Sequence, residues 1–284
     1  MIHWQVPAAQ LDLAQTLDCG QSFRWVQLDE NLFEGVVQGH CLRIARRGEE
    51  LLLEGPDIQE TQDLWWHYFA LDIDYDGLKQ AFCQDPVLAK AVAYAPGIRV
   101  LRQDPWEALC TFIISQNNNI PRIKGIVQRL CQTFGQPIPG AEHRFSFPAP
   151  QRLMGCTVSD LAPLRSGFRA RYLLDAAQKV AGGQILLDSL RQAPLSQGRE
   201  SLQQICGVGP KVADCVLLYG LQKWECVPMD VWMKRVWGIL YPDGFPAWLA
   251  HHAGIAQQFL FHYARTCPGA LEGCPQTSRE PLPV

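Results

Sequence analysis

A change in hydrophobic periodicity near residue 57 divides this chain into two kinds of secondary structure. Before it, β-branched and aromatic stretches alternate with turn residues, which is typical of antiparallel strands. After it, apolar residues recur at i, i+3, i+4 and i+7, which predicts amphipathic helices. The expected strands are 22–28, 32–38, 40–46 and 51–53. The expected helices are 59–71, 78–94, 105–115, 120–134, 150–154, 159–164, 170–181, 185–192, 199–205, 210–221, 230–241 and 246–265, with a loop over 135–150.

The fold class that follows is α+β, with a small antiparallel sheet first and a helical bulk after it. We expect an N-terminal β-sheet domain with flanking helices over residues 1–98 and a mainly helical region over 99–265. The remaining segment, 266–284, is rich in Pro and Gly and is expected to be a flexible tail.

Composition excludes several classes of protein. Hydrophobic residues make up 48% and charged residues 19% of the 284 residues, a globular balance. No apolar run approaches the roughly 20 residues of a membrane helix, and no secretory signal opens the chain. Eleven cysteines, an odd number, favour reduced thiols, and Cys267 with Cys274 alone is too few for an iron–sulfur cluster. We therefore expect a soluble, intracellular protein with no cysteine-ligated metal and no contact with a membrane.

The charge balance is less informative than its distribution. The net charge of −3 disfavours a polyanionic partner, because phosphate binding favours basic surfaces. Two segments differ from the average. Residues 99–131 carry five Lys or Arg against two acidic residues, and residues 165–179 carry four against one. These local patches are compatible with nucleic acid.

Residues 205–215 carry the pattern of a helix-hairpin-helix. One helix ends near Gly207, a Gly-Val-Gly turn follows through Val208 and Gly209, and Pro210 opens the next helix. Such a turn presents backbone N–H groups to a phosphate. The carbonyl groups of the same turn are candidates to hold a monovalent cation; they belong to Gln203, Ile205 and Val208. Taken alone, the pattern also fits a plain connection between two helices.

Lys211 and Asp230 are the candidate catalytic residues. Lys211 lies in the first turn of the second hairpin helix, where the macrodipole disfavours a cation, and a neutral amine there is a nucleophile. Asp230 precedes a helix, so it is a candidate N-cap. A carboxylate near the mouth of the hairpin is also able to stabilise positive charge on a sugar or transfer protons for Lys211.

Four motifs, in the same order along the chain, resemble one enzyme family. The hairpin with its lysine and the later aspartate is similar to the helix-hairpin-helix-GPD signature of 8-oxoguanine DNA glycosylases. The others resemble that family's N-terminal motif, its asparagine-triplet turn and the loop that it inserts into DNA. The matching residues are 207–215 with 227–231, 19–25, 101–105 with 115–120, and 167–172. The likeness spans residues 10–265 and implies a catalytic region over 99–265.

The resemblance assigns the chemistry to Lys211 and Asp230. It implies that Lys211 attacks the sugar C1′ and forms a Schiff base, while Asp230 stabilises the cationic sugar and assists proton transfer. The same intermediate permits β-elimination and therefore strand cleavage. The partner implied is double-stranded DNA containing oxidised guanine, bound by a monomer with the target base flipped out of the stack. No cofactor is required beyond the candidate structural cation.

The lesion pocket is also assigned by resemblance. Gly20 matches the residue whose carbonyl oxygen accepts the N7–H that 8-oxoguanine has and guanine lacks. Such a difference is worth about 1–3 kcal/mol when it leaves one buried group unpaired. Gln257 and Phe261, four apart on one helix face, match the residues that bind and stack on the base, and Cys215 matches the thiol on its other face. Ordinary core packing is the alternative for Phe261.

Opposite the lesion, the resemblance points to a second group of residues. Asn117 matches the side chain that fills the vacated stack, and Arg122 and Arg169 match the arginines that read the orphaned cytosine. A solvated surface is the alternative for either arginine. Phe168 occupies the wedge position, where animal enzymes carry Tyr. Trp232 departs from the family, because animal enzymes carry a phosphate-binding His there.

Two other functions remain open at this point. A monofunctional glycosylase of the same superfamily, such as an alkylation-repair enzyme, would activate water with Asp230 and would not need Lys211. A non-catalytic helix-hairpin-helix module would need the Gly-Val-Gly turn but neither of the two catalytic candidates. The residues are equally compatible with a bacterial cytoplasm and with a nucleus.

Overall fold

The computed structural model describes residues 1–267 and 269–271, without the side chain of Trp232. Most of the predicted tail, including Cys274, and the predicted change in phosphate contact at Trp232 therefore lie outside the described residues. No described helix is both long and apolar enough to span a membrane.

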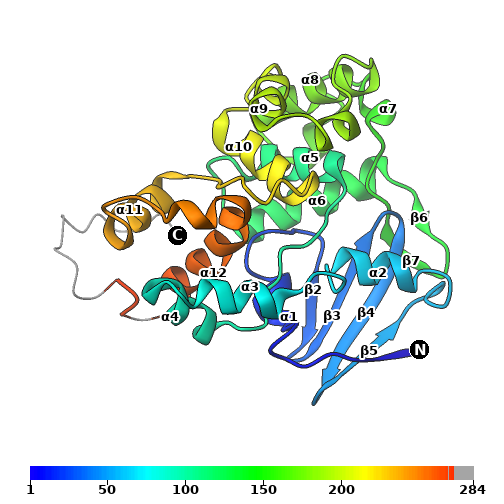
Figure 1. Ribbon diagram of the computed structural model, residues 1–284. Helices are drawn as coiled ribbons and strands as arrows, with labels where there is room; N and C mark the ends of the chain where they lie inside the picture. The colour runs from blue at the N-terminus through cyan, green and yellow to red at the C-terminus, as the bar shows by residue number, and fades with distance from the viewer. Residues whose placement is uncertain (268, 272–284) are drawn as a thin grey trace.

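Five antiparallel strands form the N-terminal sheet in the order β1-β5-β4-β3-β2 (Figure 1). Phe33 pairs with Ile44, and Ile44 pairs with Leu53, so these three side chains share one face of the sheet. Each of them is almost completely buried. The strands are β1 (Ile2–Gln5), β2 (Val26–Asp29), β3 (Leu32–Val37), β4 (His40–Arg47) and β5 (Glu50–Glu54).

An aromatic cluster covers the buried face of this sheet. Helix α2 (Gln62–Tyr68) lies across the sheet in Figure 1, and Trp65 from it meets Trp25 edge-on at 6.2 Å between ring centroids. Phe69, just after α2, contacts the same Trp25 ring at 5.9 Å. The expected small sheet is confirmed, and it has its own hydrophobic core.

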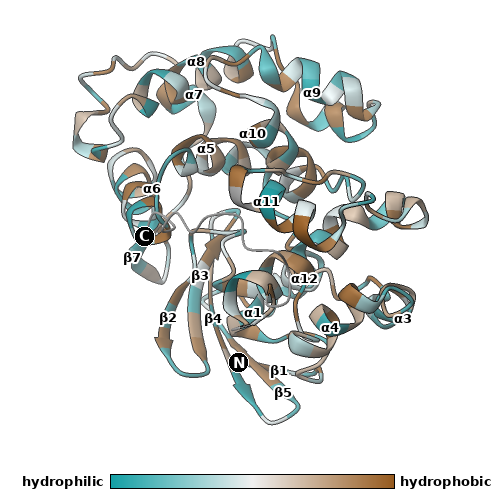
Figure 2. Cartoon of the chain, turned by 90° about the vertical axis from the view of Figure 1, so that its left-hand side faces the viewer, coloured by the Kyte–Doolittle hydropathy of each residue, from teal (hydrophilic) through white to brown (hydrophobic). Residues whose placement is uncertain are grey.

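The helical bulk surrounds helix α5 (Pro105–Ser115), which contacts α6, α8, α10 and η3. Ten of the eleven residues of α5 are buried, and the helix is brown along most of its length in Figure 2. The other helices are α1 (Leu13–Leu17), α3 (Tyr75–Phe82), α4 (Pro86–Tyr94), α6 (Ile120–Phe134), α7 (Pro150–Leu153), η1 (Ala162–Leu164), α8 (Arg169–Ala181), η2 (Leu187–Arg191), α9 (Leu195–Gln203), α10 (Pro210–Cys215), the π-helical turn η3 (Val216–Gly220), α11 (Val231–Leu240), η4 (Ala247–His252) and α12 (Ala253–Thr266).

Helix α12 returns to the N-terminal part of the chain. It contacts α4, and Phe259 meets Phe82 of α3 at 5.9 Å. Cys19 and Phe23, from the segment before β2, belong to the same helical core. This return brings α12 beside residues 19–20 and beside the hairpin helix α10, and it creates the site described below.

Several sequence-based boundaries were wrong. The first predicted strand begins at Val26, and β1 and α1 were missed, because elements of four and five residues carry too few positions to show a period. The predicted helix 78–94 is two helices. Asp85 caps α4 at the backbone N–H groups of Val87 and Leu88, and Pro86 cannot continue α3. The predicted loop 135–150 contains the short hairpin of β6 (Pro137–Ile138) and β7 (Ala141–Phe145).

Candidate active site

The predicted hairpin connects α9 to α10, and Gly207 is the residue on which its shape depends. Gly207 has φ +78°, and a Cβ atom there would lie 2.4 Å from the ring of Tyr172. Asp175 of α8 accepts a hydrogen bond from the backbone N–H of Cys206 at 2.6 Å. At Gly209, by contrast, a Cβ atom would meet no described neighbour within 4 Å. Residues of α8 therefore contact the turn at Cys206 and Gly207, whereas the space around Gly209 is open.

Lys211 lies in the first turn of α10 and projects into a pocket. Its Nζ atom lies 5.4 Å from the centroid of the Phe112 ring, and that ring stacks on Tyr219 at 5.2 Å with an interplanar angle of 15°. Cys215 lies one turn further along and lines the same pocket. An aromatic surface thus supports the amine from one side.

Asp230 is the N-cap of α11, and its carboxylate accepts a hydrogen bond from the backbone N–H of Met233 at 2.6 Å. Asp230 both caps α11 and lines the pocket that contains Lys211, so the two roles expected from the sequence are compatible. The cap restricts the rotation of the side chain. The helix terminus therefore holds the carboxylate in place.

The remaining predicted pocket residues come together from distant segments. Gly20, with φ +90°, and Gln257 and Phe261 of α12 line the pocket with Lys211 and Cys215. The side chain of Gln257 is buried; its Nε2 atom donates to the carbonyl oxygen of Pro228 at 3.3 Å. Its Oε1 atom is buried and has no hydrogen-bond partner among the described residues. An unpaired buried acceptor in a pocket points to a ligand that supplies the missing donor.

Sequence reasoning missed several residues of this pocket. They are Cys19, Phe112, Tyr219, Pro228, Met233 and Gln258. Two of them, Cys19 and Pro228, lie within the motifs at 19–25 and 227–231 without having been singled out, and the other four lie in helical stretches with no motif of their own.

The residues predicted to face the opposite base lie outside the pocket lining. Asn117 is exposed with φ +46°, and Phe168 has 46% of its surface exposed. Arg122 is exposed on the first turn of α6 and forms no ion pair with a described residue. Arg169, by contrast, is 2% exposed, and its guanidinium lies 4.4 Å from the Phe168 ring centroid. It donates to the carbonyl oxygens of Gln116 and Asn117, the latter at 2.8 Å. Arg169 therefore joins the loop of Phe168 to the turn of Asn117.

The comparisons with known proteins agree with this geometry. Residues 3–109 match the model of the 8-oxoguanine DNA glycosylase N-terminal domain, and residues 110–243 match that of the HhH-GPD superfamily base excision DNA repair protein. The N-glycosylase/DNA lyase of Saccharomyces cerevisiae is 36% identical over 80% of this chain and 68% of its own length. That of Arabidopsis thaliana is 31% identical, over 89% of this chain and 73% of its own.

This chain belongs to the 8-oxoguanine DNA glycosylase family.

A solved structure of another such glycosylase shows the same fold over nearly the whole chain. The Clostridium acetobutylicum 8-oxoguanine glycosylase/lyase, in complex with double-stranded DNA containing cytosine opposite 8-oxoguanine, superposes with a TM-score of 0.82 at 33% identity. The match covers 90% of this chain and 92% of that one. In the present glycosylase, Gln257 and Phe261 lie beyond both matched models, on α12.

The pocket of this glycosylase keeps its thiols neutral. Burial raises the pKa of Cys19 to about 11. Burial also raises the pKa of Cys215, and the neighbouring Lys211 opposes that rise. Because the thiolate is the nucleophilic form of cysteine, neither thiol competes with the amine of Lys211 at neutral pH. The arrangement therefore offers one amine and one carboxylate at a pocket that also carries an unpaired amide oxygen.

Proposed function

We propose that this glycosylase excises 8-oxoguanine opposite cytosine in double-stranded DNA through a Schiff base on Lys211, and cleaves the strand by β-elimination. The observation that carries the proposal is the pocket in which Lys211 and Asp230 meet Gly20 and Gln257. An amine and a carboxylate that line one pocket are the groups that sugar chemistry at C1′ needs.

The reaction follows from these two groups. The Nζ atom of Lys211 bonds to C1′ as the C1′–N9 bond breaks, and the base leaves with the electron pair and takes up a proton. Asp230 stabilises the positive charge on the sugar and accepts the proton that the amine releases. The C1′–O4′ bond then opens to the iminium, with a proton added at O4′. Loss of a C2′ proton expels the 3′ phosphate with the C3′–O electron pair.

Base recognition is assigned to the polar atoms of the pocket. The carbonyl oxygen of Gly20 accepts the N7–H of the lesion, and Gln257 bonds its Watson–Crick edge. The buried, unpaired Oε1 atom of Gln257 supports this role, since it lacks a donor that the base supplies. Phe261 and Cys215 contact the two faces of the flipped base.

The opposite strand is assigned to the second group of residues. Phe168 enters the stack, as its exposure permits, and Asn117 fills the gap left by the lesion. Arg122 and Arg169 are assigned to the acceptors of the orphaned cytosine, for which the guanidinium fork is suited. Arg122 is exposed for this role, whereas buried Arg169 must exchange its bonds to the carbonyl oxygens of Gln116 and Asn117 for bonds to the base.

The hairpin is assigned to the DNA backbone. The turn of Gly207, Val208 and Gly209 faces a phosphate, to which the N–H groups of the two glycines donate while that of Val208 closes the turn; the open space around Gly209 supports a close approach. The carbonyl oxygens of Gln203, Ile205 and Val208 are hard ligands of the kind that alkali cations accept. The Ile205 oxygen also accepts the N–H of Val208 at 3.0 Å, which leaves one lone pair for an ion. The protein acts as a monomer where the cell keeps its DNA, in a bacterial cytoplasm or a nucleus.

Borohydride trapping tests the proposal. A labelled duplex with 8-oxoguanine opposite cytosine is incubated with the wild type or Lys211→Gln in the presence of borohydride. We expect a covalent protein–DNA band with the wild type only, and DNA binding by both proteins. Release of free base without a band would favour a monofunctional enzyme in which water is the nucleophile. Neither band nor base release would overturn the proposal in favour of another lesion or of a DNA-binding module.

A further inference from the structure

Three polar side chains from distant segments form a hydrogen-bonded chain in the wall of the pocket. The hydroxyl of Tyr219, in η3, donates to Oε1 of Gln258 on α12 at 2.7 Å. The Nε2 atom of Gln258 donates to Sγ of Cys19 at 3.3 Å, and the Cys19 thiol donates to the carbonyl oxygen of Thr16 at 3.3 Å. The chain therefore runs from the helical bulk to the residue directly before Gly20.

All three side chains are buried, which makes the chain sensitive to the loss of any member. Tyr219 is 7% exposed, Gln258 2% and Cys19 6%. A buried polar group that loses its partner cannot turn to water, so removal of the Tyr219 hydroxyl leaves Oε1 of Gln258 without its donor. The Cys19 thiol donates at one side and accepts at the other, which only the protonated form can do. Burial keeps it in that form at neutral pH, since its pKa is raised to about 11.

Gly20 lies between this row of hydrogen-bonded side chains and a second set of hydrogen bonds, those of Gln21. On the far side of Gly20, the Nε2 atom of Gln21 donates to the carbonyl oxygens of Thr16 at 2.9 Å and Arg99 at 2.7 Å, and it also lies 3.3 Å from Sγ of Cys19, where the two sets of hydrogen bonds meet. The backbone N–H of Leu101 donates to Oε1 of the same side chain at 2.8 Å. Gly20 itself has φ +90° and carries no side chain that could anchor it. The orientation of its peptide therefore depends on what holds its two neighbours.

We propose that Tyr219, Gln258 and Cys19 are positioning residues that aim the carbonyl oxygen of Gly20 and thereby set the discrimination between 8-oxoguanine and guanine. This inference rests on the proposed function, in which that oxygen accepts the N7–H of the lesion. A hydrogen bond weakens steeply as its angle and distance change. Loss of a hydrogen bond among these three side chains therefore weakens lesion recognition and leaves contacts with the DNA backbone unchanged.

The test compares binding to three duplexes that differ at one nucleotide. They carry 8-oxoguanine, guanine or a tetrahydrofuran abasic analogue opposite cytosine, and binding is measured in the Lys211→Gln background so that the base stays attached. We expect Tyr219→Phe to weaken binding of the 8-oxoguanine duplex about three- to tenfold, the range for one lost hydrogen bond. Binding of the guanine and tetrahydrofuran duplexes stays within about twofold of the parent, because neither presents an N7–H to Gly20.

A matched control removes a tyrosine hydroxyl elsewhere. Tyr241 donates to Oδ1 of Asp85 at 2.7 Å and is also 7% exposed, but it lies outside the pocket lining. Tyr241→Phe is expected to leave the ratio of 8-oxoguanine to guanine binding unchanged. An equal loss of that ratio in Tyr241→Phe and Tyr219→Phe would overturn the inference, because a general loss of packing would then explain both.

Substitutions of Cys19 provide a second measurement that does not depend on Tyr219. Cys19→Ser keeps a donor and an acceptor and is expected to retain most of the discrimination, whereas Cys19→Ala loses it as Tyr219→Phe does. Equal behaviour of Cys19→Ser and Cys19→Ala would overturn the inference. The Lys211→Gln parent separates the two hypotheses: if it does not prefer 8-oxoguanine to guanine, the proposed function fails. If it does and Tyr219→Phe preserves that preference, only the positioning chain fails.

Discussion

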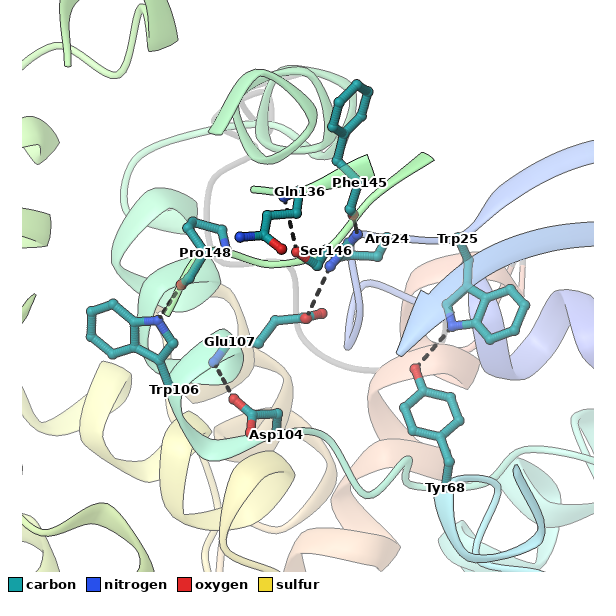
Figure 3. Close-up of polar contacts among 10 residues, drawn as sticks. All are labelled: Arg24, Trp25, Tyr68, Asp104, Trp106, Glu107, Gln136, Phe145, Ser146 and Pro148. Atoms are coloured by element: carbon teal, nitrogen blue, oxygen red, sulfur yellow. Dashed lines mark hydrogen bonds and ion pairs between the residues drawn. The ribbon is translucent and has the colours of Figure 1, made fainter. Parts of the chain in front are cut away.

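Raising the pH from 4.5 to 7 is expected to lower the free energy of unfolding through one buried carboxyl group, that of Glu107. Glu107 lies on α5 and faces Arg24, with 3.4 Å between Oε2 and Nη1, as Figure 3 shows. The guanidinium also donates to the carbonyl oxygen of Phe145. This pair joins the segment before β2 to α5 and to the β6–β7 hairpin, so its state of charge affects the contact between the sheet and the helices.

The magnitude follows from the pKa of Glu107, which is raised from 4.5 to about 7. Burial is the main cause; the charge of Arg24 opposes the rise and that of Asp104 adds to it. An acid with a raised pKa binds its proton more tightly in the folded state, so it stabilises the fold below pH 4.5. This contribution is lost as the pH rises to about 7. At about 1.4 kcal/mol per pH unit, the loss amounts to about 3 kcal/mol.

Urea unfolding followed by tryptophan fluorescence at pH 5, 6, 7 and 8 measures this effect. Glu107→Gln resembles the protonated acid at every pH, so the difference in unfolding free energy between variant and wild type isolates Glu107 from other titrating groups. We expect this difference to shift in favour of the variant up to about pH 7 and then stay constant. Glu60→Gln, at an exposed position, is the control and should show no such trend. A pH-independent difference for Glu107→Gln would refute the reasoning.

Three further predictions follow from the same structure. Gly207→Ala is expected to lower the unfolding free energy by about 1–3 kcal/mol, because of its positive φ and the Tyr172 ring; an unchanged melting temperature would contradict this. Arg122→Ala should relax the preference for cytosine more than it slows excision, and single-turnover rates opposite the four bases measure both; unchanged selectivity would remove Arg122 from that role. Glu34 has its pKa lowered to about 2 by Arg43, Arg144 and His143, against the opposing effect of burial, so its stabilising contribution is present above pH 4.5 and is lost as the pH falls toward 2. The deficit of Glu34→Gln in unfolding free energy should therefore be largest near neutral pH and shrink on acidification, the opposite trend to Glu107.

Local signals predicted some elements to the residue. Helices α5 and α6 begin and end where the sequence analysis placed them, at 105–115 and 120–134. Both carry clear start signals: Asp104 and Asn119 are N-caps whose side chains accept hydrogen bonds from backbone N–H groups, and a proline follows at the first or second position. The helix predicted over 78–94 shows the opposite case. Its apolar period continued through the break before Pro86, so periodicity alone concealed two helices.

The residues of the candidate site also fall into two groups, those with a local sequence pattern and those without one. Lys211 and Asp230 stand out because a glycine turn, a helix start and a capping position each leave a local pattern. Tyr219 and Gln258 left none, because a buried tyrosine or glutamine inside a helix is indistinguishable from ordinary core, and the motif that contains Cys19 does not show which side chains that thiol bonds. Arg169 shows the same limit: a solvated surface was the alternative that the sequence left open for it, and its burial accompanies bonds to carbonyl oxygens 52 and 53 residues away.

The α+β order of this chain, its helix-hairpin-helix turn and its family could all be read from the amino-acid sequence. Those properties depend on residues that are neighbours along the chain, where capping, turn conformation and hydrophobic period act over a few positions. The return of α12 to residues 19–20, which closes a pocket around Lys211 and Asp230, became visible only in three dimensions. Contacts between distant segments form only when the chain packs and its side chains leave water. Packing therefore decides which buried polar atoms are hydrogen-bonded and which, like Oε1 of Gln257, have no partner among the described residues.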